Sequence, residues 1–332
     1  VMKRFDFRLT LIITAILMLV ACEKEGPSIL DGGDGGETER PERWLVAAEQ
    51  LKERVVIINT KSQEVEWEWT AAKSGIPASW FTQPDEVKPV YNGNYFLITS
   101  SSGGAALIRK SDYKAVFYAQ PKGSPHSAEV LPDGCIVVAC STVASSEGDQ
   151  LKLYKVDEEN PFMSSPISTF PLKFGHNAVW DRENEVLWAT ADDVINVFDY
   201  IVSGDQRSFS LKETIKLPEG ESDAHDMFPV HGERALWLST AKSVFKFDVT
   251  TRKFTKMSGG TGLSNIKSVS SGPKEYPIMI LRPTTSWWSY NIIDTFGNPI
   301  YVGPSNLKFY KARWLLDNTF SYPAEHNFTQ PE

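Results

Sequence analysis

A repeated unit of 40 to 50 residues constrains the fold of this chain more than any other feature of its sequence. Each copy begins at a polar or ionisable residue, continues through a short strand and a tight turn, and enters a strongly apolar run. Successive starts are 40, 50, 49, 42 and 44 residues apart; they lie near Glu86 and at His126, His176, His225, Lys267 and Lys311. A unit of this length with four short strands has the size of one β-propeller blade.

The sequence between these starts has the pattern of β-strands. Short apolar runs recur, as in residues 54–59 and 243–248, and no window keeps a helical period beyond a turn or two. Glycine turns such as Asn92-Gly93 and Asp133-Gly134 separate the runs, as tight hairpins require. The sequence therefore predicts an all-β chain.

The two ends of the repeat region complete each other. Residues 44–69 supply three strands and lack an innermost one, whereas residues 311–316 supply one strand without partners. Joining them closes the first blade with the C-terminal strand and leaves no open sheet edge. We therefore predict a six-bladed β-propeller; a seven-bladed one is the alternative and would need about 45 residues more.

The N-terminus has the pattern of an export signal. Basic residues Lys3, Arg4 and Arg8 precede an uncharged apolar stretch, Leu9–Ala21. This stretch is shorter than the roughly 20 apolar residues that a transmembrane helix needs. The stretch leads directly into Cys22, and Leu-Val-Ala-Cys resembles a bacterial lipobox. We expect diacylation of Cys22 and a lipid anchor in a membrane. An ordinary secretory signal with an incidental cysteine is the alternative.

These features predict four parts of the chain. Residues 1–21 form a signal peptide, 22–43 the lipidated cysteine and a flexible Gly- and Glu-rich tether, 44–322 the propeller, and 323–332 a C-terminal tail. The charged residues after Cys22 resemble the export tags of Bacteroidetes-type surface lipoproteins. The expected location is the cell envelope, anchored to the outer membrane, with the choice of membrane leaflet left open.

Charge and cysteine content exclude two kinds of site. A formal net charge of −8 without a basic run offers no electrostatic footprint for nucleic acid. Cys135 and Cys140 fall in one apolar run at an odd offset, which places them on opposite faces of a strand and too far apart for a disulfide. We expect two buried thiols that bind no metal.

The repeat also predicts a ring of ionisable side chains. Inner strands of a propeller line the central channel, so residues at the repeat starts should converge at one mouth. They comprise one carboxylate, three imidazoles and two ammonium groups: Glu86, His126, His176, His225, Lys267 and Lys311. Such a ring could meet a polar or anionic ligand. The alternative is a framework role, in which each histidine bonds to a neighbouring blade.

The repeat resembles the β-propeller superfamily and, within it, exported lipoprotein propellers of unknown function. The signature motifs of WD, kelch and sialidase propellers are missing, so their functions are not implied. The histidines are similar in placement to those of oligogalacturonate lyases, which are propellers that bind a divalent ion. That similarity implies a metal on His126, His176 and His225. The blade number, the lack of a Gln ligand and the two lysines argue against it.

We predict a membrane-anchored protein that binds a small or oligomeric ligand, a saccharide, at the axial mouth. Trp80 lies in a loop-like segment and is the candidate for stacking on a sugar ring. Two other functions stay open: a lyase or hydrolase of uronate-containing sugars that uses the His/Lys ring, and a protein-interaction scaffold of the envelope. The sequence favours binding over catalysis, specifies no certain cofactor, and leaves the oligomeric state open.

Overall fold

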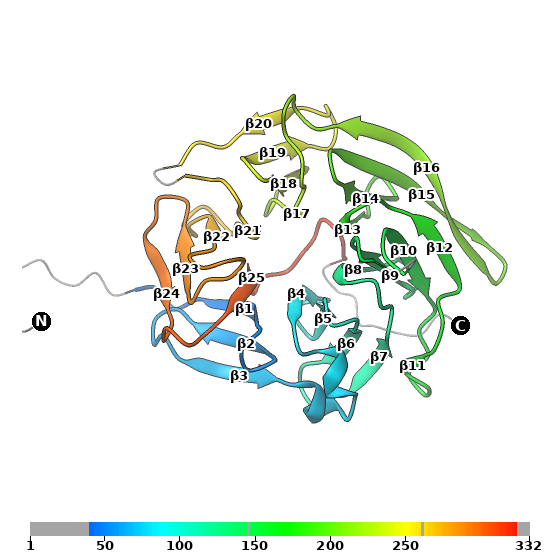
Figure 1. Cartoon of the computed structure of the whole chain (residues 1–332), viewed down its shortest axis with the longest axis horizontal. Helices are drawn as coiled ribbons and strands as arrows, with labels where there is room; N and C mark the ends of the chain where they lie inside the picture. The colour runs from blue at the N-terminus through cyan, green and yellow to red at the C-terminus, as the bar shows by residue number, and fades with distance from the viewer. Residues whose placement is uncertain (1–39, 145–146, 260–261, 324–332) are drawn as a thin grey trace, which may run out of the picture. The chain divides into compact units, whose positions relative to one another are not determined.

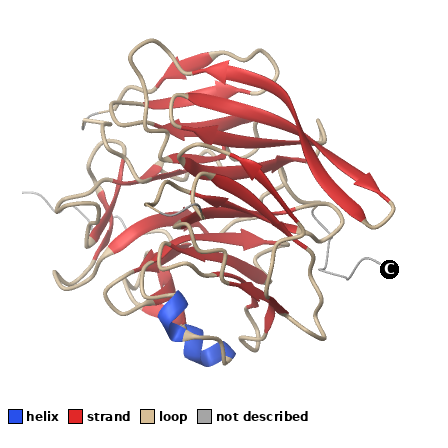
Figure 2. Ribbon diagram, turned by 45° about the vertical axis from the view of Figure 1, so that its right-hand side comes forward, coloured by secondary structure: helices blue, strands red, loops and turns tan. Residues whose placement is uncertain are grey.

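The apolar runs between the repeat starts form the middle strands of six β-sheets arranged in a ring (Figure 1). A computed structural model of the chain describes residues 40–144, 147–259 and 262–323. Helix in these ranges is limited to two short 3-10 segments, η1 (Ala71–Ser74) and η2 (Ala78–Trp80), drawn in blue in Figure 2. The prediction of an all-β, six-bladed propeller is confirmed.

The blades are antiparallel sheets whose strands follow one another from the axis outward. The first blade contains, in that order, β25 (Phe309–Trp314), β1 (Trp44–Glu49), β2 (Arg54–Asn59) and β3 (Val65–Trp69). The second contains β4 (Pro84–Val90), β5 (Tyr95–Ser100), β6 (Ala105–Arg109) and β7 (Ala115–Ala119). The third contains β8 (Pro125–Val130), β9 (Ile136–Cys140), β10 (Gln150–Tyr154) and β12 (Ser168–Pro171).

The remaining blades follow the same order. The fourth contains β13 (Gly175–Asp181), β14 (Val186–Ala191), β15 (Val194–Ser203) and β16 (Gln206–Lys216). The fifth contains β17 (Asp226–Pro229), β18 (Ala235–Ser239), β19 (Val244–Asp248) and β20 (Phe254–Lys256). The sixth contains β21 (Ser268–Ser270), β22 (Met279–Leu281), β23 (Asn291–Asp294) and β24 (Pro299–Val302). Between β10 and β12 the chain also adds β11 (Phe162–Met163), parallel to β7, to the outer edge of the second blade.

The ring closes through the first blade, where strands from the two ends of the propeller pair. Leu45 of β1 lies opposite Trp314 of β25, and Ala47 lies opposite Ala312 in the same antiparallel register. After β25 the chain passes across the centre of the ring in the view of Figure 1, and the hydroxyl of Tyr322 donates to the carboxylate of Glu129 on β8. This last segment therefore ties the first blade to the third.

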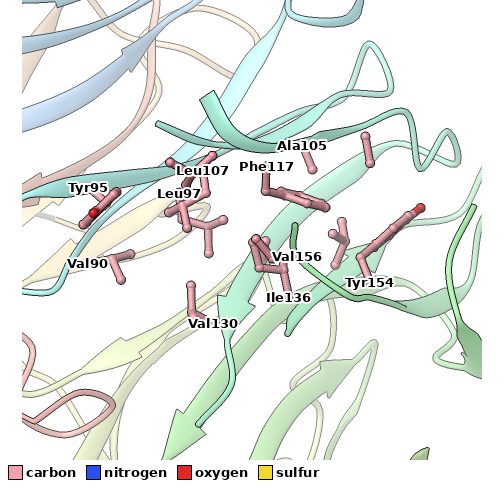
Figure 3. Close-up of a cluster of buried hydrophobic side chains, with 14 of the residues drawn as sticks. Val90, Tyr95, Leu97, Ala105, Leu107, Phe117, Val130, Ile136, Tyr154 and Val156 are labelled. Atoms are coloured by element: carbon pink, nitrogen blue, oxygen red, sulfur yellow. The ribbon is translucent and has the colours of Figure 1, made fainter. Parts of the chain in front are cut away.

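The hydrophobic core lies between the blades. Figure 3 shows one cluster, in which Leu97 and Leu107 of the second blade meet Val130 and Ile136 of the third. Middle strands are buried on both faces, which is why they read as continuous apolar runs rather than as an alternation. Burial on both faces also holds each inner strand in place, and the inner strands carry the site described below.

Two further predictions can be compared with the described residues. Cys135 and Cys140 are free, buried thiols that belong to different clusters on opposite faces of the third blade, as predicted. Cys22 and the signal segment 1–21 lie outside the described residues. Within the described ranges, no helix is long and apolar enough to cross a membrane.

Candidate axial binding site

The inner strands present one residue from each blade at the same end of the ring. In the second, third and fourth blades the inner strand starts with a β-bulge, and the bulged residue is Asp85, His126 or His176. His225 and Lys267 take this place in the next two blades, because their backbone N–H groups pair with the last residue of the second strand. Tyr310 takes it in the first blade, within the register shift of β25. These six residues are termed the histidine ring.

Contacts between side chains join five of the six residues of the histidine ring, all but Asp85, into one cluster. The imidazole centroids of His126 and His176 are 4.3 Å apart, and those of His176 and His225 are 4.8 Å apart. Nζ of Lys267 lies 2.8 Å from Nε2 of His225, and the Tyr310 ring centroid is 6.3 Å from that of His126. Three consecutive blades thus place imidazoles in mutual contact at one mouth.

The structure separates two predicted ring members from the other four. Glu86 and Lys311 lie one residue further along their strands, at the level of Ser127, Asn177 and Asp226. Their places in the ring are taken by Asp85 and Tyr310. The sequence contains a pattern that predicts this shift. Each histidine is followed by a short polar residue, and an alignment on that residue matches Glu86 to Ser127 and not to His126.

His126 and His176 share one local geometry. Two residues earlier, Ser124 and Phe174 have φ values of 54° and 53°, in the left-handed region that costs a non-glycine residue about 1 kcal/mol. Their carbonyl oxygens lie 2.9 and 3.0 Å from the imidazole Nδ1 atoms and accept hydrogen bonds from them. Nδ1 therefore carries the proton and Nε2 keeps its lone pair. Within the described ranges, no group donates a hydrogen bond to Nε2 of either histidine.

His225 and Lys267 repeat the left-handed turn with different partners. Asp223 and Asn265, two residues earlier in each case, have φ values of 58° and 55°. Nδ1 of His225 lies 2.8 Å from Oδ1 of Asp223, and the Lys267 ammonium, which can only donate, occupies its Nε2. The series of contacts from Asp223 through His225 to Lys267 fixes the position of the ammonium group in the histidine ring.

Burial sets the protonation states at this mouth. Burial lowers the pKa of His126 to about 4 and that of His176 well below 6.5, although the hydrogen bond from Nδ1 raises it in both. Burial also lowers the pKa of Lys267 to about 8, against the attraction of Asp223. It raises the pKa of Asp85 to about 8, so this carboxyl group is largely protonated at pH 7. Near neutral pH, His126 and His176 are therefore neutral hydrogen-bond acceptors.

A fully buried layer of charges lies directly beneath the histidine ring. It is termed the charged layer and pairs three carboxylates with three cations: Glu86, Glu129 and Asp226 with Lys88, Lys311 and Arg313. Both Nη atoms of Arg313 bond to Asp226, at 2.5 and 2.9 Å, and Nη2 also reaches Glu86 at 2.6 Å. Burial alone would raise the pKa of Glu86, but Lys311, Lys88 and Arg313 together hold that pKa at about 2.

The charged layer links blades through their backbones. Nζ of Lys88 donates to the carbonyl oxygens of Ala128 and Ala178 at 2.8 and 2.6 Å. The Asp226 carboxylate accepts the backbone N–H of Val269 at 2.9 Å from the next blade. These side chains lie buried directly beneath the histidine ring and tie neighbouring blades together.

Trp80, predicted to stack on a sugar, lies elsewhere. It belongs to η2 and packs against Tyr118 and Phe162 of β7 and β11, with ring centroids 6.3 and 6.0 Å away. These strands form the outer edge of the second blade, whereas the histidine ring occupies the inner strands. Trp80 is therefore separate from the axial mouth.

The geometry does not favour a metal. Among the described residues, no group of three or more His, Cys, Asp and Glu side chains is placed to hold a metal ion. Nε2 of His225 is occupied by the Lys267 ammonium, and a second cation beside it would be repelled.

Comparisons with known proteins support the fold and leave the activity open. The sequence model of a family of unknown function, DUF6528, matches residues 3–332. No curated protein matches the chain. A protein of unknown function from Bacteroides caccae is similar in structure, with a TM-score of 0.52 and 12% identity over 82% of this chain and 98% of that one. At this identity the likeness shows the propeller fold alone.

Two other solved structures are more distant. Hydrazine synthase from Kuenenia stuttgartiensis has a TM-score of 0.49 and 13% identity over 74% of this chain and 72% of that one. The β-propeller domain of Cps50 (Swd1) from Myceliophteria thermophila has a TM-score of 0.47 and 12% identity over 74% and 97%.

Proposed function

The chain belongs to DUF6528, a family of unknown function, and we propose that it is a binding protein whose histidine ring takes a hydroxyl-rich ligand, a saccharide. One observation carries this proposal: two neutral imidazoles, His126 and His176, keep Nε2 atoms to which no described residue donates. Their orientation is fixed by hydrogen bonds from Nδ1, so the acceptors are preorganised before any ligand arrives.

The other groups at the mouth complete a pattern that suits sugar hydroxyls. The Lys267 ammonium has donors beyond the one directed at His225, and the Phe174 ring lies 4.1 Å from the His176 ring, centroid to centroid. A hydroxyl group both accepts and donates, so adjacent hydroxyls can bond an ammonium and an imidazole at once. Lys311 is committed to the charged layer, which leaves one cation at the mouth and favours a neutral ligand over a strongly anionic one.

The proposal is tested by ligand-observed NMR on the full chain with glucose, galactose, mannose and N-acetylglucosamine as probes. We expect at least one of them to bind, and His126→Phe or His176→Phe to weaken that binding about tenfold, because phenylalanine keeps the ring contacts and removes Nε2. His231→Phe, outside the ring, is the matched control and should bind as the unchanged protein does. Binding that survives both substitutions, or no binding of any probe, would show the proposal to be wrong.

We also propose that Cys22 carries lipid and anchors the propeller to the bacterial outer membrane. The support is the sequence: a basic segment, an uncharged apolar stretch and the lipobox-like Leu-Val-Ala-Cys22. Metabolic labelling with a radioactive fatty acid should mark the protein, and Cys22→Ala should remove the label. Unchanged labelling of the Cys22→Ala chain would exclude this anchor.

A further inference from the structure

A cavity of about 510 Å³ lies at the other end of the inner strands. Its walls come from the ends of β17, β21 and β25, from the β17–β18 turn, and from the segment that follows β25. None of its lining residues belongs to the histidine ring or to the charged layer. The volume falls within the range of small-molecule sites, roughly 300–1,000 Å³. It is therefore a separate space of ligand size.

Aromatic rings form the apolar part of this cavity. Phe228, Trp314 and Phe320 line it and are almost completely buried. The guanidinium carbon of Arg234 lies over the Phe320 ring, 4.8 Å from its centroid. Such walls favour a flat, ring-shaped ligand.

Two serine hydroxyls at the cavity accept hydrogen bonds and keep their own O–H groups as donors. Oγ of Ser271 accepts from the backbone N–H of His231 at 3.1 Å and from Nε1 of Trp237 at 2.9 Å, so its own O–H is left to donate. Oγ of Ser270 likewise accepts from the backbone N–H of Trp314 at 3.0 Å. A ligand beside these two serines can therefore bring acceptor atoms; the carboxylates of Glu183, Glu233 and Asp317 also line the cavity.

The two arginines of the cavity differ in their partners. Arg234 is neutralised, since Nη2 bonds to both oxygens of buried Asp181 at 2.7 and 2.8 Å and Nε lies 3.2 Å from Glu183. Nη1 of Arg182 donates to the carbonyl oxygen of Tyr322 at 3.1 Å, and within the described ranges no carboxylate pairs with it. Arg182 is therefore a positioned cation with donors to spare, the group that best recognises a carboxylate.

We propose that this cavity, lined by Arg182, Ser270, Ser271, Phe228, Trp314 and Phe320, is a second binding site for a small organic acid with a flat ring. The carboxylate meets Arg182 and the serine hydroxyls, and the ring lies against the aromatic wall. The charged layer lies between this site and the histidine ring, and the guanidinium carbon of its Arg313 lies 4.2 Å from the centroid of the Phe228 ring in the cavity wall.

The test is calorimetric titration of the full chain with benzoate, nicotinate and galacturonate, with benzamide as the neutral counterpart. At least one acid should bind, and more tightly than benzamide. Arg182→Gln should weaken that binding about tenfold. Arg109→Gln is the matched control, because Arg109 also lies on the surface but pairs with Asp112 on the second blade. It should leave the affinity unchanged.

A substitution in the histidine ring separates this proposal from the axial one. Lys267→Met should leave acid binding intact, because Lys267 does not line the cavity. The proposal is wrong if no acid binds up to about 10 mM, if Arg182→Gln binds like the unchanged protein, or if Lys267→Met rather than Arg182→Gln removes binding. Failure of the axial proposal is measured with neutral sugars and does not affect these outcomes.

Discussion

The histidine ring and the charged layer are built by the same inner strands, one or a few residues apart, yet they use their polar groups in opposite ways. In the charged layer, Arg313, Asp226 and Glu86 bond mainly to one another, and all three are buried. In the histidine ring, the backbone satisfies only Nδ1 of His126 and His176, and Nε2 stays available. Polar groups that bond mainly to one another hold blades together, whereas an acceptor that no side chain or backbone group satisfies can serve a ligand.

The largest effect should come from breaking the charged layer. Arg313→Met leaves the carboxylates of Asp226 and Glu86 buried without their main partner, and we expect a loss of about 3–5 kcal/mol in the free energy of unfolding. Urea denaturation measures it. Arg109→Met, which removes an exposed pair with Asp112, should cost under about 1 kcal/mol. Equal effects of the two changes would mean that the layer is no more important than a surface ion pair.

The second effect is a pH dependence that belongs to the histidine ring. The pKa of His126 lies near 4 in the fold, below its ordinary value of 6.5, so protonation favours the unfolded chain. The stability contributed by the neutral ring is complete above pH 6.5 and is lost as the pH falls toward 4, by at most about 3 kcal/mol. Denaturation at several pH values should show this loss, and His126→Gln should flatten it between pH 6.5 and 4. An unchanged slope would place the titration on other groups.

A smaller effect is expected at the outer edge of the second blade. Trp80→Ala removes ring contacts with Tyr118 and Phe162, which should cost about 1–2 kcal/mol of stability. Axial sugar binding should not change, because Trp80 lies away from the mouth. A loss of sugar affinity in this variant would connect the two regions.

The smallest change in stability should accompany Lys267→Met. Its ammonium bonds to His225 near the mouth and takes no part in the charged layer, so we expect under about 1 kcal/mol of destabilisation. Sugar affinity should nevertheless fall about tenfold, as measured by the same NMR titration. A variant that loses several kcal/mol and keeps its affinity would assign Lys267 to the framework.

The sequence predicted the architecture well because each blade of the propeller corresponds to one copy of the repeated unit. The spacing of the starts predicted six blades, and the incomplete ends predicted the pairing of β25 with β1. Alternation and turn signals act over a few residues, so they are visible without tertiary information. The opposite faces of Cys135 and Cys140 followed from the strand period alone.

The candidate site was only partly predictable, because a single residue of register changes its chemistry. The repeat identified the histidines and Lys267 correctly. Glu86 and Lys311 were predicted in the ring, but they lie one residue after the ring positions, because the prediction ignored the bulges at the strand starts. Left-handed residues such as Phe174 carry no sequence signature, since glycine is the residue that normally marks this conformation. The second cavity forms between turns that are far apart in the sequence, so no local sequence pattern predicts it.

The pairing of β1 with β25 also has a consequence for how the protein is made. Leu45 is among the first propeller residues to leave the ribosome, and its partner Trp314 is among the last. The ring can close only when β25 is available to pair with β1, since contacts between residues distant in the sequence form late. A chain truncated before Phe309 keeps an open edge on β1 and is exposed to aggregation. Closure of the ring thus depends on the last strand of the propeller.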